Sequence, residues 1–387
     1  MRFSFTAEQE MVRQAARDFA QNELLPGVIE RDEKQTFPDE LIRKMGELGF
    51  LGLMVSPEYG GGGMDTVSYV LVMEELSKVD ASASVIVSVQ NSLINWGIET
   101  YGTEEQKRKY LPALAKGELI GAFCLSEPEA GSDATQQRTT AIRRGDYYIL
   151  SGTKNWITNA GRAGIYLVMA QTDPSQGSRG ISAFIVEREW KGVVVGKKED
   201  KLGIRGSDTH SMIFNDVKVP IENRIGEEGF GFKFAMKVLD GGRIGIAAQA
   251  LGIASGAYEL ALRYSTQRKA FSVPIAKHQA IAFKLAQMAT RVEAARLLCL
   301  RAAQAKDKGE PYGLLASLAK LYASRTAMEV TTEAIQIHGG YGYVKEYHVE
   351  RLFRDAKITE IYEGTSEIQR IVISRALGKG DVPFLCA

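Results

Sequence analysis

Apolar residues recur at helical spacing near the start of the chain. Val12, Ala16 and Phe19 are three to four positions apart, and Thr6 stands three residues before Gln9 in the spacing of a capping box. This pattern predicts a helix that begins after Thr6. The helical pattern continues to about residue 118 and is interrupted at residues 60–63, four consecutive glycines that we expect to form an inter-helix loop.

Helical spacing returns in the second half of the chain. Apolar residues alternate there in steps of four and three, which is typical of a helix in a bundle: Ile281, Leu285, Met288, Val292, Ala295, Cys299 and Ala302. Further helices are expected to begin near Phe230 and Pro311, and another after Tyr362. Together they would complete a four-helix unit.

The middle of the chain has a different period. Short β-rich runs at residues 147–150, 165–169 and 181–186 are separated by turn residues. We therefore expect a mainly α protein with a β middle domain: an N-terminal α-helical domain (1–118), a central, mostly antiparallel β domain (119–225) and a C-terminal four-helix bundle (226–387).

Composition narrows the function. The 387 residues include 48 basic and 47 acidic ones, without runs of like charge, so we expect no nucleic-acid partner and no anionic membrane surface. No apolar stretch approaches the length of a membrane span. Cys124, Cys299 and Cys386 are odd in number and far apart, and the first residues resemble no targeting signal, so we expect a cytoplasmic protein. The four histidines lack the spacing of metal ligands, so no metal is expected.

One segment near the C-terminus suggests a catalytic base. In IYEGTSEIQR (residues 361–370), Glu363 stands between Tyr362 and Gly364. Partial desolvation beside the tyrosine would raise the pKa of the carboxyl group, and the glycine would let a ligand approach the backbone. From these ten residues alone, a structural glutamate at the start of a helix, followed by a Thr/Ser cap, explains the segment equally well.

Two further segments could hold a flat heteroaromatic ring. Residues 123–133 read as a strand followed by a polar turn, and residues 156–160 combine an aromatic residue, a hydroxyl group and small residues. Taken separately, each is better explained as a β-bend with a buried tryptophan.

Taken together with IYEGTSEIQR, these segments resemble the acyl-CoA dehydrogenase family over nearly the whole chain. Residues 239–244, 268–271, 278–279 and 336–343 match in the same order. The stretch LDGGRIGIAAQALGIA and residues 88–93 are most similar to the short-chain (butyryl-CoA) branch.

The resemblance implies an enzyme of fatty acid oxidation that binds FAD. The residues it assigns to the cofactor are Phe123, Cys124, Leu125, Ser126, Gly131, Ser132, Trp156, Ile157, Thr158, Arg268, Phe271, Gln279, Gln336, Ile337, His338, Gly339, Gly340, Thr365, Ser366 and Glu367. Those from Arg268 to Gly340 would hold the adenosine diphosphate half of a neighbouring subunit's FAD. A homotetramer, a dimer of dimers, is thus implied.

The resemblance also makes Glu363 the base that takes the α-proton of an acyl-CoA while the β-hydride leaves to flavin N5, giving a trans-2-enoyl-CoA. Some branches carry the base at the position of Gly242, which here has no side chain. Substrate contacts are implied for Ser132, Asp240, Arg243, Tyr362 and Gly364.

Electrons would pass to an electron-transferring flavoprotein. The alternatives are a branched short-chain or medium-chain dehydrogenase, an acyl-CoA oxidase, which is usually longer, and a DNA-protecting flavoprotein of the same fold, which would need a basic face. A nicotinamide enzyme is disfavoured because the glycine-rich fingerprint is absent. Glu129 departs from a family pattern with glycine, so we expect backbone strain there.

Overall fold

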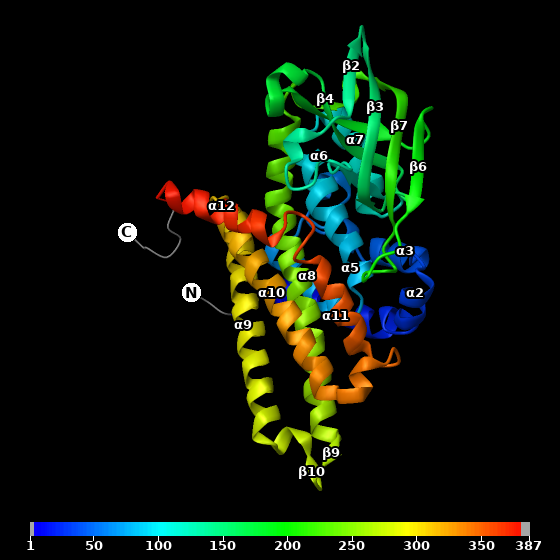
Figure 1. The fold of residues 1–387 in the computed structure, drawn as a ribbon. Coiled ribbons are helices and arrows are strands. Elements are labelled where there is room, and N and C mark those ends of the chain that lie inside the picture. Colours follow the sequence, from blue (N-terminus) through cyan, green and yellow to red (C-terminus); the bar gives the residue numbers. More distant parts are fainter. Residues whose placement is uncertain (1–3, 381–387) are drawn as a thin grey trace.

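A mixed β-sheet lies at one end of the molecule and long helices extend from it to the other (Figure 1). The computed structural model describes residues 4–380; Cys386 lies outside them. Helix α8 (Gly231–Gln267) begins beside the sheet and runs most of the length of the molecule (Figure 1). It therefore connects the sheet with the bundle.

The N-terminal region is helical, as expected. Thr6 and Gln9 form the predicted capping box, and Val12, Ala16 and Phe19 are buried. The helices are α1 (Ala7–Phe19), α2 (Val28–Lys34), α3 (Asp39–Glu47), α4 (Thr66–Ser77), α5 (Ala81–Ser88), α6 (Trp96–Tyr101) and α7 (Glu104–Ala115), with π-helical turns at Ala20–Leu24 and Val89–Asn95. Residues 60–63 lie in the loop before α4.

The sheet is mostly antiparallel. Its strands are β1 (Gly121–Cys124), β2 (Thr140–Arg144), β3 (Tyr147–Thr158), β4 (Ile165–Gln171), β5 (Ile181–Glu187), β6 (Val193–Lys198), β7 (Thr209–Pro220) and β8 (Arg224–Ile225). Their order is β6-β7-β3-β2-β4-β5-β8, and β1 pairs in parallel with β4. The fold class predicted from the sequence is confirmed.

Strand β4 is buried on both faces. Ile165, Leu167 and Met169 belong to the core shared with the helices, whereas Tyr166 and Val168 belong to a second core inside the β region. Because successive side chains point to opposite faces of a sheet, a continuous apolar run is what such a strand requires. The sheet is thus tied to the bundle by its own side chains.

The bundle is built around α8, α9 (Gln279–Asp307) and α10 (Gly313–His338), with α11 (His348–Ile358) and α12 (Ser366–Gly378) following. A hairpin of β9 (Lys269–Ala270) and β10 (Val273–Pro274) joins α8 to α9 at the far end (Figure 1). Short 3₁₀ turns lie at Phe50–Gly52, Pro57–Tyr59, Ala134–Gln136, Pro174–Gly180, Ile221–Asn223, Ile275–Lys277 and Gly339–Tyr343.

The helix expected after Tyr362 is present as α12, which packs on α10. Both α9 and α11 pack on α8 and α10, and the apolar pattern did not single out α11. In addition, α8 is long and apolar enough to pass a length-and-composition test for a membrane span, although 83% of the apolar window is buried inside the fold. A core helix of this length passes the same test.

Candidate active site

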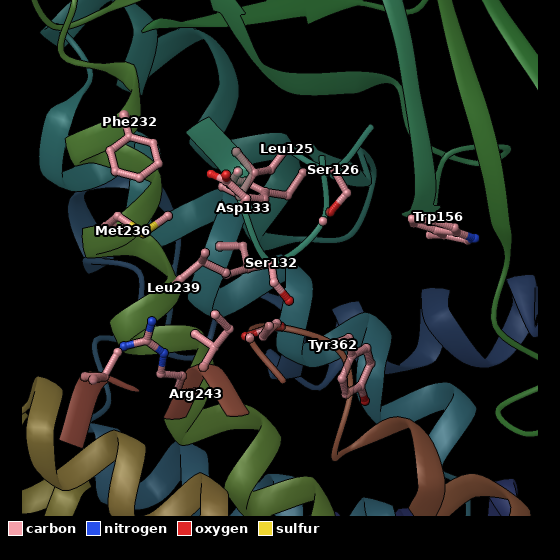
Figure 2. A pocket seen from close by; sticks show the side chains of 18 of the residues that line it. Leu125, Ser126, Ser132, Asp133, Trp156, Phe232, Met236, Leu239, Arg243 and Tyr362 are labelled. Carbon is pink, nitrogen blue, oxygen red and sulfur yellow. The ribbon is translucent and has the colours of Figure 1, made fainter. Parts of the chain in front are cut away.

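A cavity of about 650 Å³ opens where the sheet, α8 and the loop before α12 meet. Figure 2 shows Phe232, Met236 and Leu239 in a row on α8, facing the loop that follows β1, with Trp156 at the end of a strand on the other side. The remaining lining comes from Val85, Val89, Leu93, Phe123, Leu125, Ser126, residues 131–135, Ile157, Thr158, Arg243, residues 362–364, Ile368, Ile371, Val372 and Arg375. Phe232, Met236 and Leu239 thus form an apolar wall of the cavity, which faces a polar wall formed by the loop after β1.

The carboxyl group of Glu363 differs from the other polar groups that line this cavity. Its Oε2 is buried and has no hydrogen-bond partner among residues 4–380. Burial raises the pKa of the carboxyl group to about 7, although the nearby cations Lys320 and Arg243 act in the opposite direction. The carboxyl group can therefore exchange a proton near neutral pH, as a general base must.

The backbone at Glu363 is strained. Glu363 has φ +51° and Gly364 has φ +92°, so two consecutive residues are left-handed. For a residue with a side chain this conformation costs of order 1–3 kcal/mol and is typical of functional sites. Gly364 also lacks room for a side chain, because a Cβ there would lie 2.7 Å from Gln369 Nε2.

Hydrogen bonds hold this turn. The Gly364 carbonyl accepts from Lys320 Nζ at 2.6 Å and from Gln369 Nε2 at 2.8 Å. Tyr362 donates its hydroxyl hydrogen to Gln249 Oε1 on α8. In the described chain no hydrogen bond uses the Glu363 N–H, so this group remains able to donate to a ligand.

The polar wall is anchored by a buried ion pair. Lys154 Nζ, fully buried on β3, donates to Glu127 Oε1 at 2.8 Å and to the Leu125 carbonyl at 3.0 Å. Glu127 also pairs with Ala130 through two backbone hydrogen bonds, closing a tight turn around Pro128 and Glu129. These contacts hold the loop after β1 against β3.

The prediction of backbone strain at Glu129 is wrong, because this residue does not have a positive φ. Pro128 and Glu129 form the corner of the turn, and type I turns accept both residues with negative φ. The glutamate thus needs no special backbone conformation.

A bulge at the end of β3 sets the direction of Trp156. The register between β3 and β7 shifts between Lys154 and Ile157, and Trp156 has φ +56°. Bulges re-aim side chains next to active sites. The indole stays 55% exposed, and Thr158 completes this side of the cavity.

Gly242 and Arg243 on α8 flank the carboxylate. A Cβ at Gly242 would overlap Glu363 Oε2 and would lie 3.0 Å from its Cδ, so the absent side chain makes space for the carboxyl group. Arg243 lines the cavity and donates to Asp240 Oδ1 at 2.6 Å. Asp240 itself does not line the cavity.

The residues that the sequence assigned to one cofactor lie in three places. Most of the flavin and substrate residues line the cavity, whereas the Cys124 side chain is buried in the core inside the β region. Thr365, Ser366 and Glu367 begin α12, where Thr365 caps the helix. A separate hollow of about 500 Å³ is lined by Arg268, Ile337, His338, Gly339 and Gly340, together with Tyr264, Ile275, Tyr341 and Val344.

The remaining cofactor residues do not line this second hollow but lie close in sequence to residues that do. Gln336 lies in the last turn of α10 and Gln279 begins α9. Phe271 has φ +52° at the hairpin tip and is 92% exposed. Figure 1 places the hairpin at the opposite end of the molecule from the sheet. One chain alone therefore does not bring the two sets together.

Sequence reasoning missed Lys320 and much of the apolar wall. Lys320 lies on α10 among the buried residues Ala316, Ala319, Ala323 and Ala327. A lysine on an otherwise small and apolar helix face was the available signal. The wall residues Val89 and Leu93 lie on a π-helical turn that is buried on all sides, so periodicity does not select the cavity face there.

Family models match three consecutive parts of the chain: the N-terminal domain of acyl-CoA dehydrogenase at residues 6–118, its middle domain at residues 122–217 and its C-terminal domain at residues 229–378. A short-chain specific acyl-CoA dehydrogenase from Clostridium acetobutylicum is 53% identical over 374 residues, covering 97% of this chain and 99% of that protein.

Two solved structures share the fold with a TM-score of 0.96 each. One is butyryl-CoA dehydrogenase from Megasphaera elsdenii, 50% identical, with 97% of this chain and 100% of that chain covered. The other is a chain from a structure described as the electron transferring flavoprotein of Acidaminococcus fermentans, 53% identical, with 97% and 99% covered.

Proposed function

The chain belongs to the acyl-CoA dehydrogenase family, and we propose that its cavity carries out the α,β-dehydrogenation of short straight-chain acyl-CoA thioesters, with Glu363 as the base. The enzyme is an oxidoreductase. The observation that carries the proposal is the unpartnered carboxylate oxygen of Glu363, buried in the cavity between the polar loop and the apolar wall.

Homologues in this family bind FAD. The cavity of this chain suits a flat ring, because hydroxyl groups of Ser126, Ser132 and Thr158 line one side and Phe232 and Met236 line the other. When bound, FAD supplies the acceptor for the electrons removed from the substrate. Phe123 and Ile157 would complete this contact.

Glu363 would take the α-proton of the thioester. Its pKa near 7 leaves it largely ionised at slightly alkaline pH, and its buried oxygen has no competing donor. The free Glu363 N–H is suited to the thioester oxygen, where negative charge develops as the proton leaves. Gly364 and Tyr362 would border the reacting carbons, and Arg243 would meet the CoA side.

The assignment to short chains rests on the short-chain relatives. A dye-coupled assay of butyryl-, isobutyryl-, octanoyl- and palmitoyl-CoA tests this. Butyryl-CoA should give the highest kcat/KM, and a higher value for any of the others would overturn it.

We further propose a homotetramer in which each subunit holds the adenosine diphosphate end of a neighbour's FAD through Arg268, Phe271, Gln279 and residues 336–340. Residues 365–367 would make the remaining contacts with the cofactor. The support is the remote hollow and the exposed Phe271 ring. An electron-transferring flavoprotein is the proposed acceptor, and the half-exposed Trp156 at the cavity edge is suited to that path. Two buried free thiols, Cys124 and Cys299, fit the reducing cytoplasm that we propose.

A further inference from the structure

Lys320 is a buried lysine beside the proposed base. Its side chain is fully buried on α10, and its Nζ donates to the Gly364 carbonyl at 2.6 Å. Within residues 4–380, no carboxylate lies within 4.0 Å of this nitrogen. An ammonium group has three hydrogens to donate, and one hydrogen bond from this group is formed with the described residues.

This arrangement is costly for folding alone. Burying an ammonium group without a paired carboxylate is unfavourable, and an apolar side chain of similar length would fill the same space at lower cost. Accordingly, burial lowers the pKa of Lys320 to about 7, while Glu363 acts in the opposite direction. The lysine is thus expected to serve the group that it faces.

The contact made by Lys320 is with the strained turn itself. Gly364 follows Glu363 directly, and both residues have positive φ. A left-handed pair persists only where its surroundings fix it. Lys320 and Gln369 provide that restraint through the same carbonyl oxygen. Loss of the lysine contact would leave the direction of the Glu363 carboxylate less well defined.

Lys320 also acts on Glu363 through charge. The charged and titratable groups that face Glu363 are Lys320 from α10, Arg243 from α8, Tyr69 from α4 and the adjacent Tyr362. Those that face Lys320 are Glu363, Arg243, Glu360 and Glu367. Arg243 is engaged with Asp240, so Lys320 is the cation without a carboxylate partner at hydrogen-bond distance in this group of described residues.

We propose that Lys320 is a positioning residue for Glu363: its ammonium group fixes the Glu363–Gly364 turn through the Gly364 carbonyl, and its charge favours the ionised carboxylate. This inference rests on the proposed role of Glu363 as the base. It assigns Lys320 no contact with substrate.

Two variants separate the hydrogen bond from the charge. Lys320→Gln keeps an N–H donor, on a side chain that is one bond shorter, but carries no charge, and Lys320→Met removes both. Lys308→Met, at an exposed position after α9, is the matched control. The assay is the pH profile of kcat/KM for butyryl-CoA on flavin-loaded enzyme, because this parameter reports the pKa values of the free enzyme.

In Lys320→Gln the acid limb should move to higher pH by about one unit, since a neighbouring cation lowers a carboxyl pKa by about that much or more. Below pH 6 the kcat/KM of Lys320→Gln should be about tenfold lower than that of the wild-type enzyme. At alkaline pH the two values should agree, because both enzymes then have an ionised Glu363. Lys320→Met should show the same shift and a lower kcat at all pH values, with KM changed little.

An acid limb that coincides with the wild-type limb in Lys320→Gln would overturn the proposal, even if activity falls. If Lys320→Met does not retain flavin, Lys320→Gln decides the question alone. Failure of the proposed function is distinguishable, because the wild-type enzyme would then not oxidise butyryl-CoA at all.

Discussion

Replacing Gly242 by alanine should inactivate the enzyme without unfolding it. A Cβ at this position overlaps Glu363 Oε2 and comes within 3.0 Å of Glu363 Cδ and 2.8 Å of Leu93 Cδ2. Carbon atoms in good contact are about 3.5–4.0 Å apart, so the carboxyl group must move by roughly 0.5–1 Å. A misplacement of about 1 Å lowers a rate by around 100-fold, and this is the loss of kcat that we expect for Gly242→Ala.

The neighbouring glycine provides the control. A Cβ at Gly241 would meet nothing closer than Lys306 Nζ at 3.7 Å, an ordinary contact. Gly241→Ala should therefore keep its kcat and gain up to about 1 kcal/mol of stability, because alanine is the better helix former. Both variants are compared by flavin content, thermal unfolding and dye-coupled butyryl-CoA oxidation. Equal kcat values for the two variants would refute the close packing of Gly242 against the base.

Three further predictions follow from the same geometry. Wild-type kcat/KM should rise with pH through about 7, because Glu363 must lose its proton to act and burial raises the pKa of its carboxyl group; a limb near pH 4 would contradict this. Arg268→Ala should release FAD and loosen the oligomer together, as measured by flavin absorbance and size-exclusion chromatography, and a tetramer with full flavin would be evidence against the shared site. In stopped-flow experiments, the reduced enzyme–product complex should be reoxidised faster by an electron-transferring flavoprotein than by air, and the reverse order would indicate an oxidase.

Local chemistry explains which parts of the fold could be predicted from the sequence. The capping box at Thr6 and the stripe from Leu285 to Ala302 depend on neighbours within a few residues, and both are present in the structure. The continuous apolar run of β4 identifies a strand, but the residues of β1 that pair with it in parallel lie 44 positions earlier. Strand order depends on such distant pairings, which periodicity does not encode.

The same distinction applies to the site. The segment around Glu363 was identifiable because a charged residue stands between an aromatic residue and a glycine, and the structure places it in the cavity. Lys320 was missed because its meaning depends on a carbonyl 44 residues away. The prediction of strain at Glu129 is wrong because a position where relatives carry glycine need not have positive φ, and the Pro128–Glu129 corner does not have it.

The most direct test of the account is Glu363→Gln. The amide has nearly the same shape as the carboxyl group but cannot take a proton, so the variant should keep its FAD and its affinity for butyryl-CoA and lose dehydrogenation by several orders of magnitude. Flavin absorbance, substrate binding and flavin reduction in a single turnover measure all three in one sample. Rapid flavin reduction by butyryl-CoA in this variant would show that Glu363 is not the base.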